Sequence, residues 1–211
     1  MKLKRLILSC GLITLALTGY YAHAFSKDIE DYSPKEGDLI FQTETVPQAF
    51  AIQAATGSRY NHVGVVFKQG EKYYVYEAIG SVRPTLISSF VSRDSTHGRF
   101  TVMRVDRELS NSDIKRIKKE VTRHLGKKYD PTLGWSDSKM YCSELVWKAY
   151  DRGINLQLSD TRSIQERPLV SIIEKFVDSQ FDMPNVNRED PIVSPADLAR
   201  SNYLKTVFSN Y

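Results

Sequence analysis

Cys142 is the residue of this sequence most suited to nucleophilic chemistry. The chain holds two cysteines, Cys10 and Cys142, and Cys142 stands where an aromatic loop meets a stretch with helical apolar spacing, residues 143–150. A thiol at a helix N-terminus faces unpaired backbone N–H groups and the positive end of the helix dipole, which favours the thiolate. The same N–H groups can stabilise an oxyanion. Cys142 is therefore a candidate nucleophile. The alternative is that Cys142 has only a structural role, as a small apolar residue on the buried face of that helix.

A thiolate nucleophile needs a base, and His62 is the best-placed histidine. His124 lies at the end of a Lys- and Arg-rich helix, and His97 lies in a turn. His62 begins an expected strand over residues 62–67, in which alternation puts His62 and Gly64 on one face. Because glycine has no side chain, Gly64 leaves space beside the imidazole.

Glu77 is the candidate that would orient this imidazole. Strands over residues 62–67 and 72–78, joined by a four-residue loop over 68–71, place Glu77 directly opposite His62. Directly opposed residues have Cβ atoms ~5 Å apart, within reach of an imidazole–carboxylate hydrogen bond. A slip of one residue would turn Glu77 to the other face, where it would be an ordinary exposed carboxylate.

Together, Cys142, His62 and Glu77 predict acyl transfer to water. The thiolate attacks an amide or ester carbonyl, His62 protonates the leaving group, and water hydrolyses the thioester. We expect no metal and no cofactor, because the histidines beyond residue 24 form no cluster with ligand spacing.

Residues 1–24 resemble an export signal. A basic start, residues 1–5, precedes an apolar run over 6–19 and the small-x-small site Ala22-His23-Ala24. The run is shorter than the ~20 residues of a spanning helix, although an uncleaved anchor is the alternative. We expect residues 25–211 to form a periplasmic protein, in which Cys142 has no intramolecular cysteine partner.

The composition is that of one globular domain. The chain has 211 residues, of which 41% are hydrophobic and 26% charged. Removing residues 1–24 takes the formal net charge from +4 to +1. No basic run for nucleic-acid binding and no further membrane-spanning segment remain. The partner we expect is a small-molecule, peptide or lipid substrate, and the oligomeric state stays open.

Strands precede most of the helices in the expected order of elements. Residues 157–190 read as irregular apart from a helix over 169–177, and whether they form a lid stays open. The other expected elements are strands over residues 39–41, 62–67, 72–78 and 100–105, and helices over 47–56, 110–125, 143–150 and from Ser194 onward. Gly126 and Gly153 are read as helix stops. This order predicts a single α+β domain.

Six blocks carry a resemblance to a known family. On them the chain resembles the YiiX-like branch of the papain-like NlpC superfamily of bacterial cysteine hydrolases, a circularly permuted branch in which the histidine strand precedes the cysteine helix. The blocks are Glu36-Gly37-Asp38-Leu39-Ile40-Phe41, Asn61-His62-Val63-Gly64, Tyr76-Glu77-Ala78-Ile79-Gly80, Gly126-Lys127-Lys128-Tyr129-Asp130, Tyr141-Cys142-Ser143-Glu144-Leu145-Val146 and Ser194-Pro195.

The resemblance implies a permuted papain-like α+β fold, with an antiparallel sheet packed on the helix that carries the nucleophile. It also implies a Cys–His–Glu triad at Cys142, His62 and Glu77. Members often carry a tyrosine near the oxyanion site about a dozen residues before the nucleophile. Tyr129 has a similar spacing, and the alternative is a loop aromatic that closes over the helix.

The substrate stays open between two classes, since relatives act on cell-wall peptides or on amide and ester bonds of lipids. Export favours a cysteine amidase or peptidase of wall peptides. A lipid-directed hydrolase or acyltransferase is the second hypothesis, with residues 86–91 and 168–186 as candidate walls for an acyl tail or, alternatively, ordinary core and surface loop. A non-catalytic binding module is the third.

Overall fold

A computed structural model describes residues 32–45, 47–93, 98–163, 166, 187 and 189–211. By its internal contacts the chain divides into two units, Met1–Ser33 and Pro34–Tyr211, and the second is the subject below. The expected export signal over residues 1–24 and the expected helix over 169–177 lie outside the described residues. No helix among the described residues is both long enough and apolar enough to cross a membrane.

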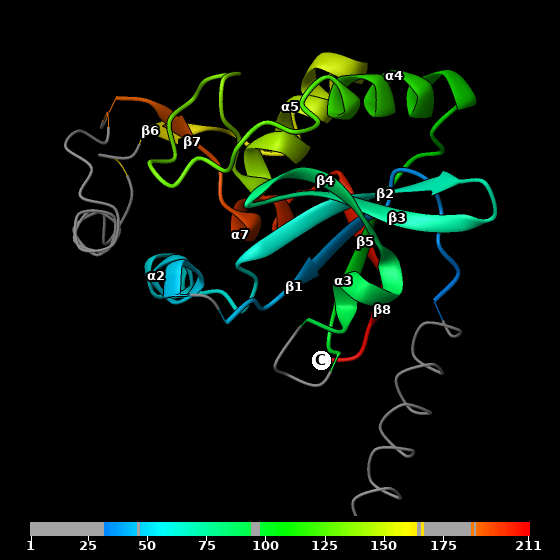
Figure 1. Ribbon diagram of the computed structural model, residues 1–211, viewed down its shortest axis with the longest axis horizontal. Coiled ribbons are helices and arrows are strands. Elements are labelled where there is room, and N and C mark those ends of the chain that lie inside the picture. Colours follow the sequence, from blue (N-terminus) through cyan, green and yellow to red (C-terminus); the bar gives the residue numbers. More distant parts are fainter. Residues whose placement is uncertain (1–31, 46, 94–97, 164–165, 167–186, 188) are drawn as a thin grey trace, which may run out of the picture. The chain divides into compact units, whose positions relative to one another are not determined.

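An antiparallel sheet is the framework of the second unit (Figure 1). The described residues form six strands in the order β4-β3-β2-β1-β5-β8. Each pair of neighbours is antiparallel. The strands are β1 (Leu39–Gln42), β2 (His62–Gln69), β3 (Lys72–Ile79), β4 (Ser81–Leu86), β5 (Thr101–Val105) and β8 (Leu204–Ser209). The short strands β6 (Arg162–Ser163) and β7 (Pro191–Ile192) pair separately. The predicted α+β class with an antiparallel sheet is confirmed.

Helices follow or interrupt the strands. They are α2 (Pro47–Thr56), α3 (Ile87–Val91), α4 (Asn111–Thr122), α5 (Cys142–Ile154) and α7 (Pro195–Ala199). Helix α5 contacts β2, β3, α4 and α7, while α3 packs against β3 and β4. Helix α4 begins with a capping box, because Ser110 Oγ accepts from the Asp113 N–H at 3.1 Å and the Asp113 carboxylate accepts from the Ser110 N–H at 3.0 Å.

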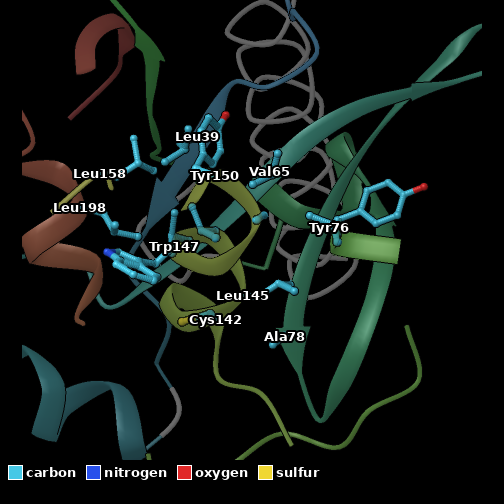
Figure 2. Close-up of a cluster of buried hydrophobic side chains, with 14 of the residues drawn as sticks. Leu39, Val65, Tyr76, Ala78, Cys142, Leu145, Trp147, Tyr150, Leu158 and Leu198 are labelled. Carbon is cyan, nitrogen blue, oxygen red and sulfur yellow. The ribbon is translucent and has the colours of Figure 1, made fainter. Parts of the chain in front are cut away.

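Helix α5 is the central packing element. Leu145, Val146 and Tyr150 are fully buried on it, in one cluster with Leu39 and Val65 of the sheet (Figure 2). This apolar face fixes the helix against β2, and the end of the helix that carries Cys142 is thereby fixed as well.

Gly153 is not the helix stop that the sequence predicts. Helix α5 continues through it and ends at Ile154, and Asn155, which follows, caps it in the left-handed conformation at φ 54°. A Cβ at Gly153 would lie 3.1 Å from backbone atoms of Ile117. Gly153 therefore permits the close approach of α4 and α5, a tertiary requirement that local turn chemistry does not reveal.

The predicted register of the β2–β3 hairpin is wrong by two residues. Lys72 faces Gln69 rather than Phe67, so the loop is Gly70-Glu71 rather than residues 68–71. Gly70 has φ 56°, as a tight two-residue hairpin turn requires. Continuing this register puts Gly64 opposite Glu77. Because side chains alternate every two residues along a strand, a register shift of two leaves Glu77 on its predicted face of the sheet. Glu77 then becomes the diagonal neighbour of His62.

Candidate active site

Cys142 is the first residue of α5 and is only 3% exposed. Its surroundings nevertheless include a cavity of about 750 Å³, which it lines. The start of the helix is held by Glu144, whose Oε2 accepts from the Tyr141 N–H at 3.3 Å. The thiol therefore lies at a fixed helix N-terminus (Figure 2). It also lines a space that can admit a ligand.

His62 and Glu77 are in direct contact. His62 Nε2 lies 2.7 Å from Glu77 Oε2, and the two residues are 5% and 0% exposed. Gly64 lies beside this pair and leaves no room for a side chain of its own, because a Cβ there would lie 2.4 Å from Val75 Cγ1 and 2.9 Å from the Tyr76 carbonyl oxygen. The two residues are thus brought together through a register different from the predicted one.

The imidazole of His62 connects Glu77 to Cys142. Burial alone would lower the pKa of His62, but a hydrogen bond and charge interaction with Cys142, and the same with Glu77, raise it to about 10. Because Nε2 is engaged by Glu77, Nδ1 is the ring nitrogen left for the thiol. Phe90 of α3 stacks on the ring, with centroids 5.6 Å apart, and fixes its plane.

Two residues that sequence reasoning missed complete the surroundings of Glu77. Arg93 donates to both carboxylate oxygens, at 2.9 and 2.6 Å, and Thr85 Oγ1 donates to Oε1 at 2.5 Å. Burial would raise the pKa of Glu77, but His62 and Arg93 lower it to about 2. Glu77 is therefore an ionised acceptor. Thr85 lies on strand β4, whose sequence, with Pro84 and several polar residues, lacks the usual pattern of a strand.

Tyr129 is near Cys142, as its predicted role requires. Its backbone N–H donates to the Gly80 carbonyl at 2.9 Å, which ties the loop before α5 to the end of β3. Burial and the charges of Cys142 and Asp130 raise the pKa of Tyr129, so its hydroxyl keeps its proton at neutral pH. Tyr129 and Cys142 line the same cavity.

The cavity beside Cys142 has a mixed lining. Its wall is formed by Cys142 and Tyr129 together with Ile52, Ala55, Thr56, Leu133, Tyr141, Ser143, Gln157, Leu158, Ser159, Asp160, Arg162, Ile192, Val193, Ser194, Pro195, Asp197, Arg200, Ser201, Asn202 and Tyr203. Residues 86–91, suggested as walls of an acyl pocket, are not among them. Instead, Ile87, Phe90 and Val91 are buried in the core. The other suggested wall, residues 168–186, lies outside the described residues.

The described part of the chain holds no group of three or more His, Cys, Asp and Glu side chains able to bind a metal ion. His62 and Cys142 are suitable ligand types, but both oxygens of Glu77 already accept from His62, Arg93 and Thr85. Around Cys142, the described residues do not fit a metal centre.

Two proteins named YiiX are similar to this chain. The chain is 32% identical over 176 residues to the protein YiiX of Escherichia coli strain K12, covering 83% of this chain and 87% of that protein. The crystal structure of the metalloprotein yiiX from Escherichia coli O157:H7 is similar with a TM-score of 0.79 and 31% identity, covering 85% of this chain and 99% of that one.

A family of permuted papain-like amidases, YaeF/YiiX, the C92 family, matches residues 33–208. That range includes both the strand that begins with His62 and the helix that begins with Cys142. The chain belongs to this family of permuted papain-like amidases.

Proposed function

We propose that the protein is a cysteine amidase that hydrolyses an amide bond through a thioester on Cys142. The observation that carries the proposal is the hydrogen-bonded pair of His62 and Glu77, coupled to Cys142 at the start of α5. A nucleophile, a base and an acid that orients the base are the elements that covalent acyl transfer needs.

The reaction follows from these positions. The Cys142 sulfur attacks the substrate carbonyl and its proton resides on His62, which Glu77 holds in one orientation. Backbone N–H groups at the start of α5 and the Tyr129 hydroxyl stabilise the oxyanion. The imidazolium then gives its proton to the leaving amine. In the second half, His62 takes a proton from water, which attacks the thioester and releases the acid and the free thiol.

The substrate we propose is a peptide of the bacterial cell wall. Support comes from the export signal expected in residues 1–24, which would deliver the enzyme to the periplasm. The polar side of the cavity, including Gln157, Arg162 and Arg200, offers hydrogen-bond partners for a peptide with free carboxylates.

A lipid-directed hydrolase or acyltransferase is the second candidate. The observation that favours it is the apolar part of the same cavity wall, with Ile52, Leu133, Leu158 and Ile192. An acyl chain bound there would place its carbonyl beside Cys142.

Product analysis separates these functions. The mature protein is incubated at neutral pH with purified wall peptides, with N-acyl amino acids and with phospholipids, and the products are identified by mass spectrometry. The proposal expects new amines from the wall peptides and none with Cys142→Ala. If the protein hydrolyses the N-acyl amino acids or the phospholipids but not the wall peptides, the lipid-directed function would be established. A wild-type protein that turns over none of them, with ligand binding intact, would instead be a binding module.

A further inference from the structure

The carboxylate of Glu77 has its hydrogen-bonding capacity filled by three side chains. Oε2 accepts from His62 and from Arg93 Nη2, and Oε1 accepts from Arg93 Nη1 and from Thr85. An ionised carboxylate offers about four lone-pair sites. Since the planar guanidinium bonds both oxygens at once, Glu77 cannot rotate without breaking the Arg93 contacts.

Arg93 and the imidazole are held by the same aromatic ring. Phe90 of α3 stacks on His62, and the guanidinium carbon of Arg93 lies 5.1 Å from the centre of the Phe90 ring. The Arg93 N–H also donates to the Phe90 carbonyl at 3.3 Å. The segment over residues 87–93, which follows β4, therefore fixes both His62 and Arg93, the two side chains that contact Oε2 of Glu77.

Charge gives Arg93 a role that packing alone would not. A guanidinium stays protonated at all relevant pH values, whereas His62 gains and loses a proton during the proposed reaction. If His62 were the only cation, each transfer of its proton would leave Glu77 buried without a compensating charge. Glu77 would then take up a proton and lose its acceptor oxygen. With Arg93 in place, Glu77 stays ionised in both states of His62.

The charged groups that face this unit come from several elements. Cys142 of α5 interacts with His62. Arg93 Nη2 lies 3.5 Å from Glu44 Oε1, so a second carboxylate after β1 shares the guanidinium. Arg83 of β4 is the backbone partner of Glu77, but its side chain is exposed. Arg93 is therefore the cation, apart from His62, that directly contacts Glu77 among the described residues.

We propose that Arg93 is a positioning residue of this site, which keeps Glu77 ionised and in one orientation while His62 gains and loses its proton. This inference rests on the proposed function, because it assigns Arg93 a part in the proton transfers of Cys142 and His62.

The chain offers a matched control in Arg104. It donates from Nε and Nη2 to the two oxygens of Asp38, at 2.6 and 2.8 Å. In both pairs the carboxylate side chain is 0% and the arginine side chain 24% exposed. Arg104→Gln removes an arginine–carboxylate pair of equal burial that does not contact His62. It therefore measures the purely structural effect of such a loss.

The test measures the rate at which iodoacetamide alkylates Cys142 between pH 4 and 10, together with the melting temperature. Arg93→Gln should slow alkylation at neutral pH by about tenfold or more and change the shape of the pH profile. Arg93→Lys keeps the positive charge but loses the planar guanidinium that bonds both oxygens of Glu77. Its alkylation rate should lie between those of Arg93→Gln and the wild type. Arg104→Gln should lower the melting temperature while leaving the rate and profile unchanged.

Each other outcome has a defined meaning. If Arg93→Gln keeps the wild-type profile, or if both glutamine variants slow alkylation equally, the arginine is only structural and the inference is wrong. Should Arg93→Gln fail to fold, the profile of Arg93→Lys decides by the same criterion. If the wild-type thiol itself reacts no faster than glutathione, the proposed function fails, and this inference fails with it.

Discussion

Glu77 and Glu144 are two fully buried glutamates whose surroundings have opposite effects. Glu77 contacts His62 and Arg93, which lower its pKa to about 2 against the effect of burial. For Glu144, burial prevails and raises the pKa to about 7, although Lys148 Nζ lies 2.6 Å away and the Tyr141 N–H donates to it.

The difference lies in the number and arrangement of the donors. Glu77 receives a bidentate guanidinium, an imidazole and a hydroxyl. Glu144 receives one ammonium, which it shares with Asp137 and the Ser136 carbonyl, and the charge of Asp130 repels it. Of these two buried carboxylates, the one that contacts both an imidazole and a guanidinium has the lowered pKa. Glu77 is suited to orient a base, whereas Glu144 holds the start of α5.

Removing one cationic partner of each glutamate, His62 beside Glu77 and Lys148 beside Glu144, should distinguish the two sites most strongly. His62→Ala should lower amide turnover by about 10⁴-fold, because no base remains for Cys142. Lys148→Met should change turnover far less and should act on stability, since Glu144 can take up a proton. Turnover with the identified substrate and urea denaturation of each variant provide the measurements. Equal turnover losses in the two variants would contradict the distinction.

Glu77→Gln should have the next largest effect. The amide keeps one acceptor oxygen but must present N–H groups to donors, including Arg93, so the imidazole loses its fixed orientation. We expect turnover to fall by about 10²-fold with little change in substrate affinity. Steady-state kcat and KM determine this, and a loss confined to KM would show that Glu77 serves binding instead.

The two glutamates should contribute to stability with opposite pH dependence. Glu77 has a pKa below its ordinary 4.5, so its stabilisation is complete above pH 4.5 and is lost as the pH falls toward about 2. Glu144 has a pKa above its ordinary 4.5, so the native state binds the extra proton between about pH 4.5 and 7. Stability from this group therefore falls as the pH rises through that range.

Chemical denaturation of the wild type and of the two Gln variants from pH 3 to 8 measures these slopes. The difference in the free energy of unfolding between wild type and Glu77→Gln should shrink as the pH falls below 4.5. As the pH falls from 7 to 4.5, the free energy of unfolding of the wild type should increase relative to that of Glu144→Gln. Each change should be on the order of 1–3 kcal/mol. Slopes of the same sign would remove the basis of the comparison.

The smallest effect should come from Glu144→Gln on catalysis. The amide oxygen can still accept from Lys148 or from the Tyr141 N–H, so the start of α5 should stay in place. We expect turnover within about threefold of wild type, since Glu144 does not itself line the cavity and is not among the groups that shift the pKa of His62. A loss comparable to that of Glu77→Gln would assign Glu144 a direct part in the reaction.

Much of this site could be predicted from sequence because its signals are local. The cap of α4, the strand of His62 and the loop-to-helix position of Cys142 each depend on residues close together in the chain. The sequence predicts the contact between His62 and Glu77 even though the predicted hairpin loop is two residues too long. Strand alternation has a period of two, so that error left Glu77 on the correct face.

The rest depends on contacts that local patterns do not carry. Strand β4 contains Pro84 and polar residues, which read as a loop, yet an edge strand tolerates proline. Without β4, Thr85 cannot be placed beside Glu77, and neither can Arg93 after α3. The role of Gly153 likewise arises only when α4 and α5 pack together. The cavity combines side chains of α2, α5 and α7 that are far apart in the chain.

The reactivity of the thiol in the wild type and in His62→Ala shows whether Cys142 is a nucleophile activated by His62. The second-order rate of alkylation by iodoacetamide at pH 7 is compared with that of glutathione under the same conditions. A thiol activated by His62 should react much faster than glutathione in the wild type, and His62→Ala should abolish that excess. A wild-type rate no higher than that of glutathione, or an excess that survives in His62→Ala, would contradict this activation.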